Sequence, residues 1–173
     1  GVIDLYLEKI KASNIKCHLF HGIYLINLAN ENKDLVDRAV ESLVTYQQLA
    51  KKIGSMGTVF HLGSHKGKGL EAVLDQVAGA LVRILAATPD GVSLLLENAA
   101  GHNGTLGQTL EEIEEIMHVV EKKGGEMEKL ALCIDTQHAF ASGYDLRNQT
   151  GRQSLIDEVE TRFGVEKLLA VHL

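Results

Sequence analysis

The stretch VSLLLE at residues 92–97 decides the fold of this chain, because a short apolar run ends there in a carboxylate. Four other apolar runs follow the same pattern, at residues 16–20, 58–60, 130–134 and 167–171. Runs of this length and composition are typical of buried strands. A residue that can bind a metal comes directly after each run, and the set is His21, His61, Glu97, Asp135 and His172.

The segments between these runs have the periodicity of helices. Apolar residues recur every three or four positions within residues 36–50, 70–85, 110–120 and 155–159, and a further helix is indicated over residues 5–10. Helices that alternate with short strands predict a parallel sheet with crossover helices. We therefore expect a single α/β domain over residues 1–173 with about five parallel strands.

The overall composition is that of a soluble globular protein, with 45% apolar and 23% charged residues. No apolar run approaches the roughly 20 residues that a membrane-spanning helix needs, and no signal peptide is recognisable, so we expect a cytoplasmic protein without membrane contact. The two cysteines form no CxxC pair, which argues against a cysteine zinc site. The net charge of −6 argues against a general nucleic-acid binder, but it permits a nucleic-acid enzyme whose bound cations offset its carboxylates.

The period of a strand places the five candidate ligands on one face of the sheet. Side chains two positions apart point to the same side of a strand, which puts His172 in phase with Ala170 and Leu168. Bulkier residues, such as Phe60, fall on the opposite face and suit packing against helices. We therefore expect the five side chains to converge at the C-terminal mouth of a (β/α) barrel.

Five such residues in phase indicate a metal site, although any one of them alone is more often an ordinary polar strand end. Mixed histidine and carboxylate ligands favour zinc or manganese over magnesium or calcium. A carboxylate that bridges two of these ions would form a two-metal site suited to in-line attack on phosphorus. His138, expected in the loop past residue 134, is a candidate ligand for a further metal. The basic residues near the mouth could contact phosphates or be solvated surface, and they are Lys66, Lys68, Arg147 and Arg152.

Four segments carry a resemblance that covers nearly the whole chain. They are HGIYLINL at residues 21–28, FHLGSH at 60–65, ENAAG at 97–101 and CIDTQHAFASGYDLR at 133–147. Together they resemble endonuclease IV, the family of zinc-dependent apurinic/apyrimidinic endonucleases. The last segment distinguishes this family from the sugar isomerases that share its TIM (β/α)8 barrel.

The resemblance implies a trinuclear zinc site, in which manganese is a possible substitute. The residues that match the family's ligands are His21, His61, Glu97, Asp135, His138 and His172. The first three would hold one zinc, Glu97 would bridge to a second that Asp135 and His172 also bind, and His138 would bind a third.

The resemblance further implies the activity of a DNA-repair hydrolase. Such an enzyme incises double-stranded DNA 5′ to abasic sites through metal-activated water, and the catalytic residues would be Glu97, Asp135 and His172. Tyr24 and Leu25 match residues that enter the DNA minor groove and help to hold the abasic nucleotide outside the helix.

The resemblance also predicts that this chain is part of a longer protein. The family forms a monomeric eight-stranded barrel of roughly 250 to 300 residues, whereas the five strands expected here correspond to the third to the seventh. The absent segments would supply one more ligand to the paired zincs and two to the third. Leu62 and Gln137 also depart from the family's usual proline and cysteine, at positions that are not ligands. We expect the chain alone to bind zinc, to cleave abasic DNA poorly and to self-associate through exposed sheet edges.

Two other interpretations of the sequence remain open. A xylose-isomerase-like sugar isomerase or epimerase on the same barrel would use one metal, and it would need neither His138 nor the GYDLR segment at residues 143–147. A metal-binding fragment without activity is the other alternative. More than one tightly bound zinc per full-length chain would favour the nuclease over the isomerase.

Overall fold

A computed structural model describes residues 1–102 and 104–173 of the chain. Its centre is one five-stranded sheet in which every neighbouring pair is parallel and the strands follow chain order. The strands are β1 (Phe20–His21), β2 (Gly57–Phe60), β3 (Ser93–Glu97), β4 (Leu130–Asp135) and β5 (Leu168–His172). The predicted α/β class is confirmed, and the sheet curls into a half-barrel, part of a TIM barrel.

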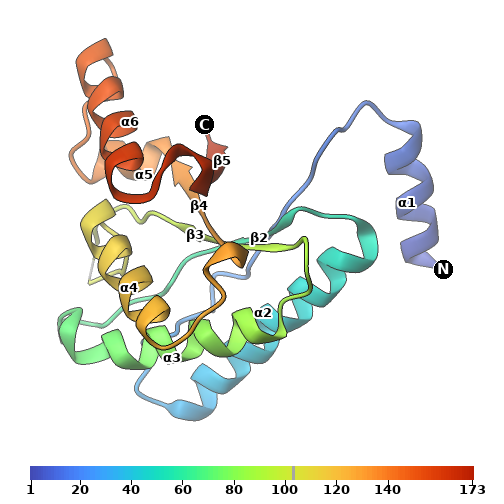
Figure 1. Ribbon diagram of the computed structural model, residues 1–173, viewed down its shortest axis with the longest axis horizontal. Helices are drawn as coiled ribbons and strands as arrows, with labels where there is room; N and C mark the ends of the chain where they lie inside the picture. Colours follow the sequence, from blue (N-terminus) through green and yellow to red (C-terminus); the bar gives the residue numbers. More distant parts are fainter. Residues whose placement is uncertain (103) are drawn as a thin grey trace.

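Helices connect the strands as the periodicity predicts. They are α1 (Val2–Ala12), α2 (Lys33–Ile53), α3 (Glu71–Ala87), α4 (Leu110–Lys122), α5 (Thr136–Ala141) and α6 (Gln149–Phe163), with short 3₁₀ turns at Met127–Lys129 and Val165–Lys167. Each of α2, α3, α4 and α6 contacts the next along one side of the sheet, whereas α1 stands apart from it and buries no residue (Figure 1). Among the described residues, the structure contains no helix whose length and hydropathy would let it span a membrane.

The two faces of the sheet bury different sets of side chains. Phe60, Leu94, Leu96, Leu132 and Ile134 belong to the large core between sheet and helices. Smaller residues on the inner face form a second cluster of Val59, Leu95, Ala131 and Cys133, against which Leu19 and Ala170 pack. The alternation expected from the sequence therefore holds in the three central strands. It turns Glu97 and Asp135, at the ends of β3 and β4, and His61, just past β2, toward the inner face.

The two edge strands differ from the sequence prediction. The first strand was expected over residues 16–20, but the ladder with β2 covers only Phe20 and His21. A single backbone bond, from the N–H of Met56 to the carbonyl of His18, precedes it. In β5 a bulge pairs Leu132 with Leu168 and Cys133 with Ala170. Leu168 therefore packs toward the helices rather than inward, so its predicted phase was wrong, while His172 keeps the expected phase.

Candidate metal centre

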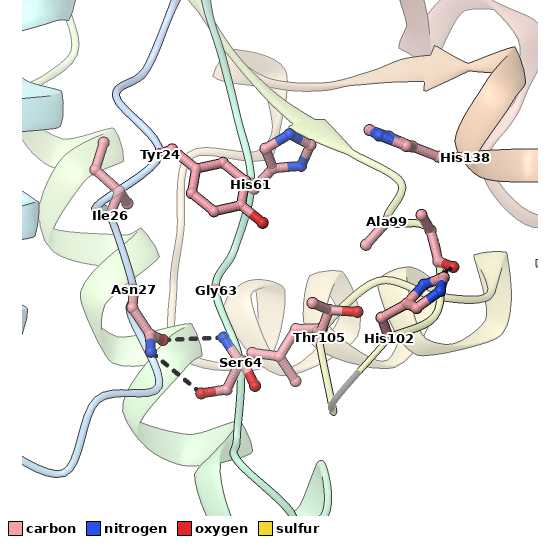
Figure 2. Close-up of a pocket in the computed structure, with 12 residues that line it drawn as sticks. Tyr24, Ile26, Asn27, His61, Gly63, Ser64, Ala99, His102, Thr105 and His138 are labelled. Atoms are coloured by element: carbon pink, nitrogen blue, oxygen red, sulfur yellow. Dashed lines mark hydrogen bonds between the residues drawn. The ribbon is translucent and has the colours of Figure 1, made fainter. Parts of the chain in front are cut away.

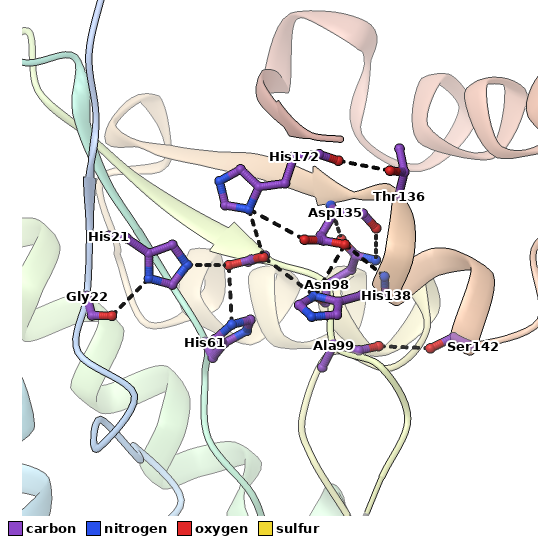
Figure 3. A network of polar contacts seen from close by, with 11 residues as sticks. His21, Gly22, His61, Asn98, Ala99, Asp135, Thr136, His138, Ser142 and His172 are labelled. Atoms are coloured by element: carbon purple, nitrogen blue, oxygen red, sulfur yellow. Dashed lines mark hydrogen bonds and ion pairs between the residues drawn. The ribbon is translucent and has the colours of Figure 1, made fainter. Parts of the chain in front are cut away.

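A buried carboxylate at the end of the central strand organises the candidate site. The Glu97 side chain is only 1% exposed, and it pairs with four imidazoles. Figure 3 labels these histidines, which are His21, His61, His138 and His172. Glu97 Oε2 lies 2.8 Å from Nε2 of His21 and 3.5 Å from Nε2 of His61. Glu97 Oε1 lies 3.0 Å from Nδ1 of His172 and 3.5 Å from Nδ1 of His138. Within the described chain, the ion pairs that the structure gives Glu97 are all with histidines, so its charge has no lysine or arginine partner.

Two groups of side chains have the geometry to hold metal ions, and they share Glu97. One group is His21, His61 and Glu97, and the other is Glu97, Asp135 and His172. In each group, one ligand atom from every residue lies within 4.8 Å of the others. The structure thus brings together all five residues that follow the apolar runs. The donor set is a buried carboxylate that is surrounded by imidazoles and has no lysine or arginine partner among the residues that the structure describes. Such a set suits zinc and similar ions.

His138 also faces this cluster, although it belongs to neither three-residue group. It lies in α5 rather than in the expected loop, because the Asp135 side chain caps that helix by accepting from the backbone N–H of His138 at 2.8 Å. Its Nδ1 lies 3.0 Å from the carbonyl oxygen of Asn98 and 3.8 Å from Oδ1 of Asp135. Its ring centroid is 5.3 Å from that of His61.

Backbone carbonyls orient two of the imidazoles. His21 Nδ1 is 2.9 Å from the carbonyl of Gly22, and His138 Nδ1 contacts the carbonyl of Asn98. Because a carbonyl oxygen can only accept, Nδ1 is the donor in each of these contacts. In His21, Nε2 is then the nitrogen that faces Glu97, and it is the atom that would bind a metal held between the two side chains.

Asn98 supports the site through hydrogen bonds that the sequence analysis did not predict. Its Oδ1 accepts from the backbone N–H of Asp135 at 2.6 Å, and its Nδ2 donates to the Asp135 carbonyl at 3.1 Å. One side chain thereby ties the ends of β3 and β4, which carry Glu97 and Asp135. The signal in the sequence was an asparagine directly after a strand-end ligand.

Burial shifts the pKa values of two groups, one in the site and one beneath it. Burial lowers the pKa of His61 below its usual value, and the attraction of Glu97 opposes this effect. His61 is therefore neutral near pH 7 and offers a lone pair. Beneath the site, burial together with the nearby carboxylates raises the pKa of the Cys133 thiol to about 12. Cys133 accordingly stays protonated and does not compete as a thiolate ligand.

A cavity of about 370 Å³ opens beside the cluster (Figure 2). His61 and His138 form its wall toward the metal groups, and Asn27, Ser64, His102 and Thr105 line the remainder. The Tyr24 ring borders the cavity 6.0 Å from the ring of His61, although 86% of Tyr24 remains exposed. Leu25 is 87% exposed beside it. Tyr24 thus lines the cavity, and the side chains of both residues project into solvent.

Three of the four basic residues considered as phosphate contacts make other interactions. Lys68 pairs with Glu31 at 2.7 Å, and Arg147 pairs with Asp145 at 2.8 Å. Arg152 donates to the Leu146 carbonyl and borders an apolar groove beside α6 and β5, away from the metal groups. The structure thus leaves two of the four candidate phosphate contacts already ion-paired, and a third in another groove.

Comparison with known proteins agrees with the resemblance seen in the sequence. A family described as xylose isomerase-like TIM barrel matches residues 2–173. A protein named probable endonuclease 4 from Thermotoga neapolitana is 36% identical over 170 residues, which are 98% of this chain and 56% of that relative. The crystal structure of endonuclease IV from Thermus thermophilus matches with a TM-score of 0.80 and 26% identity, over 98% of this chain and 57% of that one. The resemblance to endonuclease IV is therefore confirmed.

The same fold occurs in a protein of different description. A D-tagatose 3-epimerase-like protein also matches with a TM-score of 0.80, at 22% identity, over 99% of this chain and 60% of that one. At this identity the similarity shows the barrel architecture alone. The chain spans little more than half the length of the relatives that it matches.

Proposed function

This chain belongs to the xylose isomerase-like TIM barrel family, and we propose that it is the metal-binding part of a zinc-dependent phosphodiesterase of DNA base-excision repair. The proposed reaction is incision of the DNA backbone 5′ to an abasic site. The observation that carries the proposal is the position of Glu97, whose two carboxylate oxygens face separate groups of ligands. A shared carboxylate is the arrangement that holds two cations close enough to act on one phosphate.

The residues of this chain would divide the work at the proposed site. His21 and His61 would hold one zinc, Asp135 and His172 would hold the second, and Glu97 would contact both. Zinc bound there would supply a Lewis acid that neutralises phosphoryl charge and lowers the pKa of water. Neutral His61 supplies a lone pair near pH 7, and buried Glu97 supplies a negative charge that attracts cations.

Contact with DNA is proposed for the exposed residues at the mouth. Tyr24, which lines the cavity, and the next residue, Leu25, present an aromatic and an aliphatic side chain to solvent. Exposed apolar side chains of this kind suit insertion into a base stack, and an adjacent cavity suits a displaced nucleotide. The chain carries a net charge of −6, so bound cations would be needed to attract a phosphate backbone. Cytoplasmic location and self-association of the chain stay predictions.

A sugar isomerase or epimerase on the same barrel is the competing function. Two observations favour the nuclease. His138 faces the cluster as a further potential ligand, and a small polar sugar gives no reason for an aromatic and an aliphatic side chain to project into solvent. The two functions also differ in the number of metals required, which makes them separable by experiment.

The test combines metal content, binding and turnover of the purified 173-residue chain. After equilibration with zinc and dialysis, elemental analysis should find at least one zinc per chain. Fluorescence anisotropy should show tighter binding to a duplex with a tetrahydrofuran abasic analogue than to the intact duplex. The Tyr24→Ala, Leu25→Ala double variant should lose that preference, whereas Ile156→Ala should keep it, because Ile156 is an exposed apolar residue on α6.

Activity completes the test. We expect slow incision of the abasic duplex by this chain, because each group found here supplies only three ligand residues. Absence of zinc binding together with equal affinity for both duplexes would contradict the proposed function. Epimerisation of a ketose by the zinc-loaded chain would favour the competing function, and rapid incision would overturn the expectation that the chain alone cleaves poorly.

A further inference from the structure

The loop that carries Tyr24 and Leu25 is exposed at its tip and buried at its base. Tyr24 and Leu25, here called the tip, are more than 80% exposed. The next residue, Ile26, is only 4% exposed, and Leu28 is fully buried in the main core. An exposed tip binds a large ligand more tightly when its base is already ordered, because ordering a flexible loop upon binding lowers the affinity.

One side chain at the base joins this loop to its neighbour. Asn27 Oδ1 accepts from the backbone N–H of Ser64 at 3.1 Å, and Asn27 Nδ2 donates to the Ser64 carbonyl at 3.2 Å (Figure 2). The same Oδ1 also accepts from the N–H of Ala29 at 3.0 Å. A backbone bond from Leu28 N–H to the Leu62 carbonyl, at 3.0 Å, runs alongside. The side-chain amide of Asn27 thus pairs with the backbone of Ser64 as a residue of a neighbouring strand would, beyond the ends of β1 and β2.

The neighbouring loop has no side chain at the point where Asn27 approaches. A Cβ atom on Gly63 would lie 2.2 Å from Asn27 Oδ1 and 2.6 Å from Asn27 Cα. Gly63 also has a φ of +104°, which L side chains rarely adopt. Both features make glycine a requirement for the close contact between the loops.

A third element ties down the other side of the base. Gln76, on α3, donates through Nε2 to the carbonyls of Leu28 at 2.8 Å and Asn30 at 2.9 Å. The base is therefore bonded to the loop after β2 on one side and to a helix on the other. Tyr24 and Leu25 project away from both supports, and Ile23 before them is 50% exposed.

We propose that Asn27 is a positioning residue, which sets the tip of Tyr24 and Leu25 against the cavity beside His61. The distances support this role, because Asn27 pairs with the segment that begins at His61 and continues through Ser64. The proposal rests on the proposed function for the identity of the ligand, a duplex with an abasic site. It concerns how the tip is held, which can be measured without any ligand.

The first experiment follows the motion of the tip in the free protein. The chain contains no tryptophan, so Tyr24→Trp provides a single reporter at the tip. Time-resolved fluorescence anisotropy should show a high residual anisotropy in this background and a clear decrease when Asn27→Ala is added. Asn30→Ala is the matched control, because Asn30 lies in the same loop and its side chain accepts locally, from the N–H of Asn32. That control should leave the anisotropy unchanged.

The second experiment measures the consequence for DNA. Asn27→Ala should weaken binding of the abasic-analogue duplex about tenfold, as expected for the loss of several hydrogen bonds that order a contact loop, and should change intact-duplex affinity less. Zinc content should stay equal to that of the parent, because Asn27 belongs to neither of the metal groups. If the parent chain does not prefer abasic DNA, the proposed function fails, and the anisotropy experiment still decides the role of Asn27.

Two more variants separate a loss of the Asn27 hydrogen bonds from general misfolding. Asn27→Asp keeps the acceptor for Ser64 and Ala29 but loses the donor, so its anisotropy should fall between those of the parent and Asn27→Ala. Gly63→Ala should displace Asn27 from the other side and loosen the tip as well. Unchanged tip anisotropy in folded Asn27→Ala or Asn27→Asp protein overturns the proposal.

Discussion

The rings of His21 and His172 stack with their centroids 5.7 Å apart and their planes inclined by 28°. These residues end β1 and β5, the two edge strands of the sheet. In a flat sheet, four steps between strands would separate them by about 19 Å. Their contact therefore measures how strongly the sheet curls, and it explains how Glu97 on the central strand meets a histidine from each edge.

The curl makes Glu97 the residue on which both metal groups depend. Glu97→Gln keeps the size of the side chain but removes its charge, so we expect loss of most bound zinc in equilibrium dialysis followed by elemental analysis. The control is Glu31→Gln, because Glu31 is an exposed carboxylate outside the site. Full zinc content in Glu97→Gln would show that the shared carboxylate is not needed.

The two bonds from Asn98 to Asp135 should matter for metal affinity. Asn98→Ala removes both bonds, and groups that orient ligands typically contribute about 10- to 100-fold to metal affinity. We expect a weakening of about that size in zinc titrations against a chelator. Asn98→Asp retains the acceptor but sets an oxygen against the Asp135 carbonyl, so it should not restore affinity at neutral pH. Equal affinity in all three proteins would contradict a supporting role for Asn98.

Stability of the metal-free protein should depend on pH through His61. Burial lowers the pKa of His61 in the folded state, so the unfolded chain binds more protons between that lowered pKa and the unfolded value of about 6.5. The free energy of unfolding should therefore fall as pH drops below about 6.5, with a slope of at most about 1.4 kcal/mol per pH unit from this residue.

Urea unfolding in the presence of a chelator, at several pH values between about 5 and 7.5, would measure this dependence as about one proton or less. His61→Gln should have a shallower slope than the parent. His118→Gln should retain the parental slope, because the His118 side chain is 59% exposed on α4. Parallel slopes for the parent and His61→Gln would refute the assignment to His61.

The two thiols should differ in their reaction with a small disulfide reagent. Cys133 is fully buried beneath the metal groups, whereas Cys17 is exposed. We expect rapid modification of one thiol in the native protein and of the second only after unfolding by guanidinium. Cys17→Ser should abolish the rapid phase, and Cys133→Ser should leave it intact. A rapid phase of two thiols would mean that the inner face of the sheet opens readily.

Much of the site follows from local pattern. Strand alternation placed Val59 and Leu95 on the inner face and directed the side chains at the strand ends toward one another. The prediction was wrong for Leu168, because a bulge in β5 shifts its pairing with β4 by one residue between Leu132 and Cys133. A bulge depends on how two strands twist against each other, and residues 168–172 alone carry no sign of that twist.

The sequence did not predict the hydrogen bonds that Asn27 and Asn98 make to the next βα unit. Asn27 and Asn98 each bond both the N–H and the carbonyl of a residue 37 positions away, in the next βα unit. Asparagine is common in loops and at turns for local reasons, so its presence at these positions did not reveal a distant partner. The placement of His138 in a helix depended likewise on whether the Asp135 side chain would turn back to cap it.

The sequence by itself determined the order of strands and helices, the buried face of the central strands and the set of residues that meet at the mouth. It could do so because the periods of strands and helices are local properties of the backbone. The tertiary structure alone decided which oxygen of Glu97 faces which histidine, and which asparagine holds each loop. These features depend on the curl of the sheet and on bonds between βα units, and the curl that brings His21 against His172 is a property of all five strands together.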